Sequence, residues 1–76
     1  MNKTKGCFDY SKLRGKIREV YGSERAFAEH VGISSVSLSS KLNGKTRFSQ
    51  DDIRNYAYAL NIIGDDIGSY FFTEKL

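Results

Sequence analysis

The sequence predicts an all-α fold, a compact bundle of five short helices in a single domain that spans residues 1–76. Apolar residues recur at intervals of three and four, which is the spacing of one face of a helix. Proline is absent from the 76 residues, and glycines stand where the apolar stripes end, as expected of helices separated by glycine turns. A chain of this length is sufficient for one domain only.

The composition excludes several ways of stabilising so small a domain. One Cys and one His form neither an internal disulfide nor a structural zinc site, which needs about four ligands. No apolar run approaches the ~20 residues that span a bilayer, and the first residues lack the apolar core of a signal peptide. With a lone thiol the expected location is a reducing cytoplasm, and we expect no membrane, metal or cofactor and a flexible arm at residues 1–7.

The first two helices have recognisable ends. Residues 10–21 form the first, with Asp9 as candidate N-cap and Gly22 as its stop. The second follows Ser23 as N-cap and ends before Gly32. The apolar stripe of the first helix consists of Leu13, Ile17, Val20 and Tyr21.

A serine-rich segment follows, with five serines in residues 34–40. A flexible linker and a strand are its local alternatives, the strand because residues 35–39 alternate polar and apolar. Leu38 and Leu42 have the helical i, i+4 spacing, and nothing else in the chain has the pattern of a strand. We therefore predict a helix over residues 34–43, with Ser34 as N-cap.

The fourth helix has the best-marked start. Ser49 is its N-cap, and Asp52 at the third helical position completes a capping box. Phe48 and Ile53 form the expected hydrophobic staple. Ile53, Ala57 and Leu60 form its buried stripe, with Tyr56 flanking it.

A short fifth helix opens at residues 64–66 and contains Ile67, Tyr70 and Phe71. The acidic pairs at residues 51–52 and 65–66 lie at helix starts, where carboxylates favour the helix dipole. We therefore expect them to stabilise these starts rather than to serve catalysis or a metal ion.

The second and third helices together form the pattern of a helix-turn-helix. Ala28 is small where the next helix must approach, and Gly32 accommodates a positive φ at the turn. Leu38, six residues later, packs between the two helices. In proteins with this motif the second helix enters the DNA major groove.

Charge is unevenly distributed along the chain. Residues 1–47 carry 10 Lys/Arg and 4 Asp/Glu, a net charge of +6, whereas residues 48–76 carry a net charge of −3. A basic face indicates a polyanionic partner, nucleic acid first. A randomly uneven solvated surface is the alternative.

The segment from Ser23 to Ser34, continued by Leu38, residues 42–46 and Phe48, resembles the lambda-repressor-like DNA-binding domains, which include phage Cro and repressor proteins. The resemblance covers roughly residues 8–76. It implies a five-helix bundle that binds operator DNA as a symmetric dimer, without a cofactor or a small-molecule ligand.

Helix geometry and the resemblance together assign roles around the third helix. The residues expected to contact bases are Ser35, Val36, Ser39 and Ser40. The residues expected to contact phosphates, through side chains or backbone amides, are Arg25, Lys41, Asn43, Gly44, Lys45, Thr46 and Arg47. Glu24 departs from the resemblance, because a carboxylate at the start of the second helix repels DNA.

The C-terminal segment is the expected dimer surface. Its large apolar residues are too many for a short segment to bury alone, and completion of the monomer core is the alternative. The residues concerned are Tyr70, Phe71, Phe72 and Leu76.

The leading prediction is a sequence-specific, double-stranded-DNA-binding transcriptional regulator of the phage Cro or repressor type, active as a homodimer. The alternative is a protein-interaction module, such as an antirepressor, that has kept the fold and lost DNA binding. The neutral serine face and Glu24 favour this alternative. We expect no enzyme, because no nucleophile, base and orienting group occur together in the sequence.

Overall fold

The computed structural model describes residues 8–73, and this part of the chain contains five helices. They are α1 (Ser11–Tyr21), α2 (Glu24–Val31), α3 (Ser35–Leu42), α4 (Gln50–Leu60) and α5 (Asp66–Phe71). The predicted all-α, five-helix fold is therefore confirmed. The predicted arm at residues 1–7 and the predicted interface residue Leu76 lie outside the described residues.

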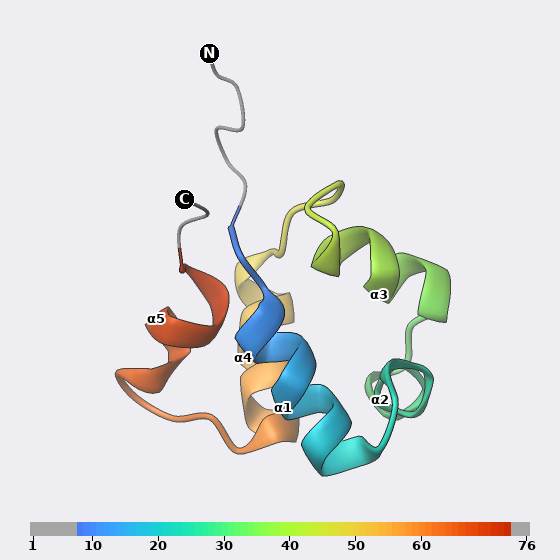
Figure 1. Ribbon diagram of the computed structural model, residues 1–76, viewed down its shortest axis with the longest axis horizontal. Helices are drawn as coiled ribbons and strands as arrows, with labels where there is room; N and C mark the ends of the chain where they lie inside the picture. Colours follow the sequence, from blue (N-terminus) through green and yellow to red (C-terminus); the bar gives the residue numbers. More distant parts are fainter. Residues whose placement is uncertain (1–7, 74–76) are drawn as a thin grey trace.

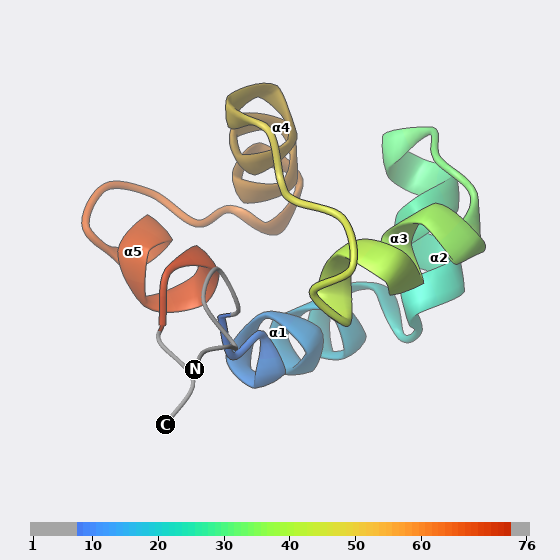
Figure 2. The ribbon, with the colours of Figure 1, turned by 90° about the horizontal axis from the view of Figure 1, so that it is seen from above.

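The helices form one bundle with two distinct sides (Figures 1 and 2). The centre of the bundle is α1, which packs against α2, α4 and α5. Both views place α2 and α3 on one side and α5 on the other, with α1 and α4 between them. None of these helices is long and apolar enough to cross a membrane.

The predicted caps place the helix starts correctly because capping is a local interaction. The hydroxyls of Ser23, Ser34 and Ser49 each accept a hydrogen bond from a backbone N–H three residues later, at 3.0 Å. The carboxylate of Asp52 accepts the Ser49 N–H at 3.0 Å and completes the capping box. At α1 the cap position is Tyr10, one residue after the predicted Asp9, whose carboxylate accepts the Ser11 N–H at 2.9 Å.

The core is built from the predicted apolar stripes, with two differences. Leu13, Ile17, Phe27 and Leu38 are fully buried, as their spacing predicts. Val20 is 47% exposed, since no neighbouring helix covers that side of the last turn of α1, and its predicted burial is wrong. Tyr56, predicted to flank the core, lies inside it, 2% exposed.

Aromatic rings connect the helices through edge-to-face contacts, the arrangement that the ring quadrupole favours. The Tyr56 ring lies 5.2 Å from Phe27 and 5.4 Å from Phe48, and Phe48 lies 5.5 Å from Phe71. Burial, with a smaller contribution from the charge of Asp52, raises the pKa of Tyr56 to about 12. The Tyr56 hydroxyl therefore stays protonated, and it has no hydrogen-bond partner within the described part of the chain.

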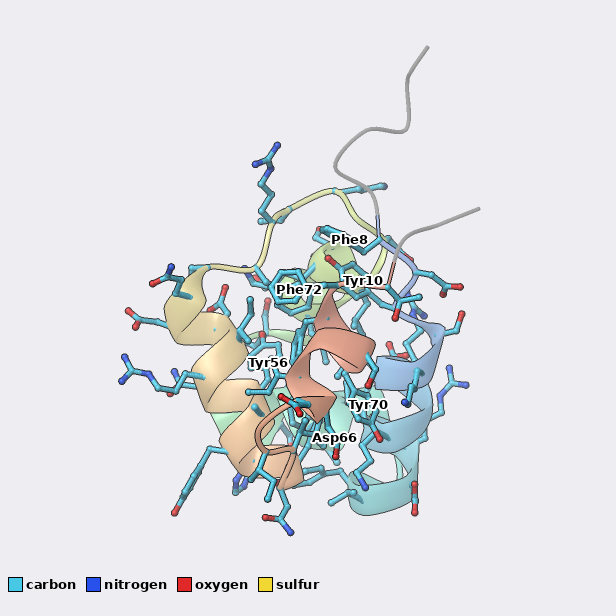
Figure 3. All side chains as sticks on the ribbon, turned by 90° about the vertical axis from the view of Figure 1, so that its left-hand side faces the viewer. Phe8, Tyr10, Tyr56, Asp66, Tyr70 and Phe72 are labelled. Carbon is cyan, nitrogen blue, oxygen red and sulfur yellow. The ribbon has the colours of Figure 1, made fainter. Side chains whose placement is uncertain are left out.

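The two ends of the described chain lie side by side. The Asp9 N–H donates to the Thr73 carbonyl at 2.8 Å, and the Phe8 and Phe72 rings meet at 5.7 Å (Figure 3). The backbone pairing fixes the end of α5 against the start of α1.

The C-terminal aromatics divide between core and surface. Phe71 is 1% exposed, so its predicted place in a dimer interface is wrong: its ring completes the core. Tyr70 is half-buried, and the Lys12 ammonium lies 4.6 Å from its ring centre, which ties α5 to α1. Phe72 is 49% exposed and remains available at the surface.

Candidate functional site

The turn between α2 and α3 has the geometry that its sequence pattern predicts. Gly32 has φ 85° and ψ 29°, the left-handed conformation that favours glycine. The N–H groups of Gly32 and Ile33 both donate to the Ala28 carbonyl at 2.9 Å, which closes the end of α2. Leu38 is fully buried beside Ala28. The two helices cross steeply, since Figure 1 looks down α2 while α3 lies across the view.

The outer face of α3 gathers the four residues predicted to contact bases. They line one shallow hollow of about 400 Å³ together with two residues predicted to contact phosphates. The lining consists of Ser35, Val36, Ser39, Ser40, Asn43 and Lys45. We name this hollow the α3 face.

Val36 stands out on the α3 face. Its side chain is 75% exposed, although it is apolar, and small serines surround it. From Ser35 to Ser40 the helix carries no charged residue. Apart from Lys45 at its edge, the α3 face is therefore neutral, with one prominent apolar group and room for a close approach.

The backbone amides after α3 serve the helix rather than an external anion. The Gly44 N–H donates to the Lys41 carbonyl at 3.1 Å. The N–H groups of Lys45 and Thr46 both reach the Ser40 carbonyl, at 2.9 and 3.3 Å. These bonds satisfy the last carbonyls of α3. The N–H of Gly44, a residue predicted to contact phosphate, is thus already used within the turn.

Lys41 also has an internal role. Its ammonium donates to the Asp52 carboxylate at 2.9 Å and to the Arg47 carbonyl at 3.3 Å. The side chain is 15% exposed, so the ion pair joins α3 to the start of α4 away from open solvent. Lys41, predicted to contact phosphate, is therefore engaged within the chain.

Asp52 is the anionic half of this pair. Burial alone would raise the pKa of its carboxyl. Hydrogen bonds from Ser49 and Lys41, together with the Lys41 charge, overcome this effect and hold the pKa of Asp52 below its ordinary value of 3.8. The group is therefore charged at neutral pH and stabilises the junction of α3 and α4.

Glu24 is neutralised by two cations of α1. Its carboxylate lies 3.3 Å from the Arg14 guanidinium and 3.5 Å from that of Arg18. Arg14 donates a second bond, of 2.6 Å, to the side-chain carbonyl of Asn43 at the end of α3. Sequence reasoning placed Arg14 on a solvated helix face, because its partners Glu24 and Asn43 are 10 and 29 residues away and no local pattern indicates the contacts.

Three cations predicted to contact phosphates remain accessible. Lys45 and Arg47 are exposed and form no ion pair with any residue from 8 to 73. Arg25 is 82% exposed and lies 3.9 Å from Glu29, a separation at which an exposed pair holds weakly. Thr46 is also exposed.

Comparison with known proteins places this fold in a family. The family model for a protein of unknown function, DUF739, matches residues 6–74. Among solved structures, the chain is similar to the modulator of repression (MOR) of the temperate bacteriophage TP901-1 from Lactococcus lactis. The two are 36% identical with a TM-score of 0.79, and the match covers 97% of this chain and 99% of that one.

No curated protein sequence matches the chain. The resemblance to lambda-repressor-like domains stays a prediction, as do DNA binding and the dimer. With 69 of 76 residues inside the family model, the chain belongs to the DUF739 family of proteins of unknown function.

Proposed function

We propose that this chain is a small phage regulatory protein that modulates repression by binding a repressor protein through its α3 face. The similarity to a phage modulator of repression over nearly the whole chain supports the regulatory role. The choice of a protein rather than DNA as the partner rests on the charges around α3. The protein acts by binding, without catalysis.

The observation that carries this choice is the internal pairing of the cations nearest α3. Arg14 and Arg18 are held by Glu24, and Lys41 is held by Asp52. The three accessible cations of residues 8–73 that were predicted to contact phosphates correspond to a log–log salt slope of about −2.7 for one chain and about −5.4 for a dimer. A complex with 6–10 phosphate contacts has a slope of about −5.4 to −9, so a dimer of this chain reaches only the weak end of that range.

The α3 face has the features of a protein contact. Val36 offers an apolar group that gains about 1.5–3 kcal/mol when a partner buries it. The serines beside it let a partner backbone approach closely, and their hydroxyls both donate and accept hydrogen bonds. Lys45 at the edge of the same hollow supplies a charged rim, where charge steers association more than it adds affinity.

Isothermal titration calorimetry with the repressor of the same phage tests the proposal. Wild-type chain binds, Val36→Asp abolishes binding, and the control Val20→Asp, at a surface valine of α1, leaves it unchanged. In parallel, random-sequence duplex DNA at ~50 mM salt shows weak binding without sequence preference. Sequence-selective DNA binding that Lys45→Ala and Arg47→Ala abolish, with no heat from the repressor, contradicts the proposal and restores the DNA-binding alternative.

A further inference from the structure

A second surface, separate from the α3 face, lies between α4 and α5. It is a groove of about 950 Å³ that is walled by both helices and by the link of residues 61–65. Its wall includes Ile53, Ala57, Ile62 and Ile67. None of the residues of the α3 face lines it.

One wall of the groove is formed by α4 along its whole length. The lining residues from this helix and its cap are Gln50, Ile53, Arg54, Ala57, Tyr58, Ala59 and Asn61. All but Ala59 follow the spacing of one helix face and form a stripe, in which Ile53 is half-buried, Ala57 belongs to the core and the other four are exposed. The eleven residues of α4 extend about 16 Å. The stripe therefore has the length and the periodicity of a seat for another helix of about three turns.

Large apolar side chains stand open around the groove. Tyr58 is 89% exposed, Ile63 is 72% exposed and Phe72 is 49% exposed. All three line the same groove: Tyr58 lies on α4, Ile63 on the link between α4 and α5, and Phe72 at the end of α5. A group of such residues rimmed by polar ones marks an interaction site rather than scattered surface apolar residues.

The lip of the groove is acidic. Asp65 and Asp66 are exposed beside the lining residues Gly64 and Ile67, and they form no ion pair with any of residues 8–73. Figure 3 shows Asp66 at the outer end of α5, where the link from α4 arrives. Arg54, the cation of the opposite wall, is already paired with Asp51 at 3.0 Å. The groove thus presents uncompensated negative charge.

We propose that this groove binds an amphipathic helix of a partner protein, whose apolar stripe fills the groove and whose flanks carry Lys or Arg. A helix docked in an apolar groove inserts its own i, i+3, i+4 and i+7 side chains. A second copy of the chain fits worse, because two-fold packing on this groove brings the acidic lips of both copies together.

The probe is a surface-displayed library of single-helix peptides, selected on the immobilised full chain. Enriched peptides carry an apolar stripe flanked by Lys or Arg. Ile63→Asp weakens their binding at least about tenfold, whereas Val36→Asp changes it less than about twofold. Asp65→Lys with Asp66→Lys weakens it about tenfold, and reversing the charges of a peptide restores it. Because Ile63 is exposed, we expect Ile63→Asp to leave the fold intact, and an unchanged melting temperature of the variant checks this.

Three results overturn the proposal. The first is a selection without enrichment over blank resin. The second is a set of peptides without basic flanks, or one that responds to Val36→Asp and not to Ile63→Asp. The third is dimerisation of the wild-type chain at a protein concentration of about 100 μM together with a monomeric Ile63→Asp variant. In that case a second copy of the chain occupies the groove. Loss of repressor binding on Val36→Asp is independent of all three, so the two proposals fail separately.

Discussion

Asp52 is the residue whose removal tests the packing around α3 most sharply. Its carboxylate accepts the Ser49 N–H at 3.0 Å and the Lys41 ammonium at 2.9 Å, so it caps α4 and joins α4 to α3. Loss of this capping-box hydrogen bond costs about 1 kcal/mol. Loss of the partly buried ion pair adds about 0.5–1 kcal/mol. Asp52→Ala therefore lowers the free energy of unfolding by about 1.5–2 kcal/mol.

The assay is thermal and urea unfolding followed by circular dichroism. For a domain of this size 1 kcal/mol corresponds to about 4–8 °C, so Asp52→Ala lowers the melting temperature by about 10 °C. Asp52→Asn keeps an acceptor for the Ser49 N–H and loses only the charge, so it costs about 0.5–1 kcal/mol. The matched control is Asp51→Ala, because Asp51 precedes it on the same turn and pairs with Arg54 in solvent, 80% exposed. This control costs less than about 0.5 kcal/mol.

The pH dependence gives an independent check. Because folding lowers the pKa of Asp52, its charge contributes stability above the unfolded value of 3.8, and that contribution is lost as the pH falls through the lower folded value. The advantage of wild type over Asp52→Asn is therefore constant near neutral pH and disappears in strong acid. An advantage that persists in strong acid, or an Asp51→Ala variant as unstable as Asp52→Ala, refutes this reasoning.

Three further outcomes follow from single contacts. Tyr56→Phe removes a buried hydroxyl without a partner among residues 8–73, so stability in urea stays equal or rises by up to about 1 kcal/mol; a clear loss contradicts this. Gly32→Ala forces a Cβ into φ 85° and costs about 1–2 kcal/mol, whereas Gly15→Ala within α1 gains about 0.5–1 kcal/mol, both measured by thermal unfolding. Glu24→Gln frees two arginines, so non-specific binding to duplex DNA tightens and the salt slope steepens by about 1–2; an unchanged slope shows that those arginines do not face DNA.

Local signals predicted the helices well. Ser23, Ser34 and Ser49 each cap the helix that follows, because a cap depends on only three or four successive residues. The serine-rich α3 forms a helix despite its strand-like alternation, since Leu38 and Leu42 are both buried on one side of it. The residues predicted to contact bases lie together because they share the outer side of this helix.

The ion pairs between helices could not be predicted from the sequence. Lys41 and Asp52 are eleven residues apart, and nothing in the local pattern indicates that they pair. Glu24 was recognised as awkward for DNA binding, but its two arginine partners come from a different helix. Tyr58 continues the helical spacing of α4 on a face that the bundle leaves uncovered, which only the packed structure reveals.

The central claim is that the α3 face binds protein rather than DNA. Backbone amide chemical shifts, followed by NMR while repressor or duplex DNA is added to the same labelled sample, test it most directly. We predict that the repressor shifts the signals of Ser35, Val36 and Ser39, while DNA at ~150 mM salt leaves them in place. Shifts at these residues with DNA and none with repressor would contradict the account.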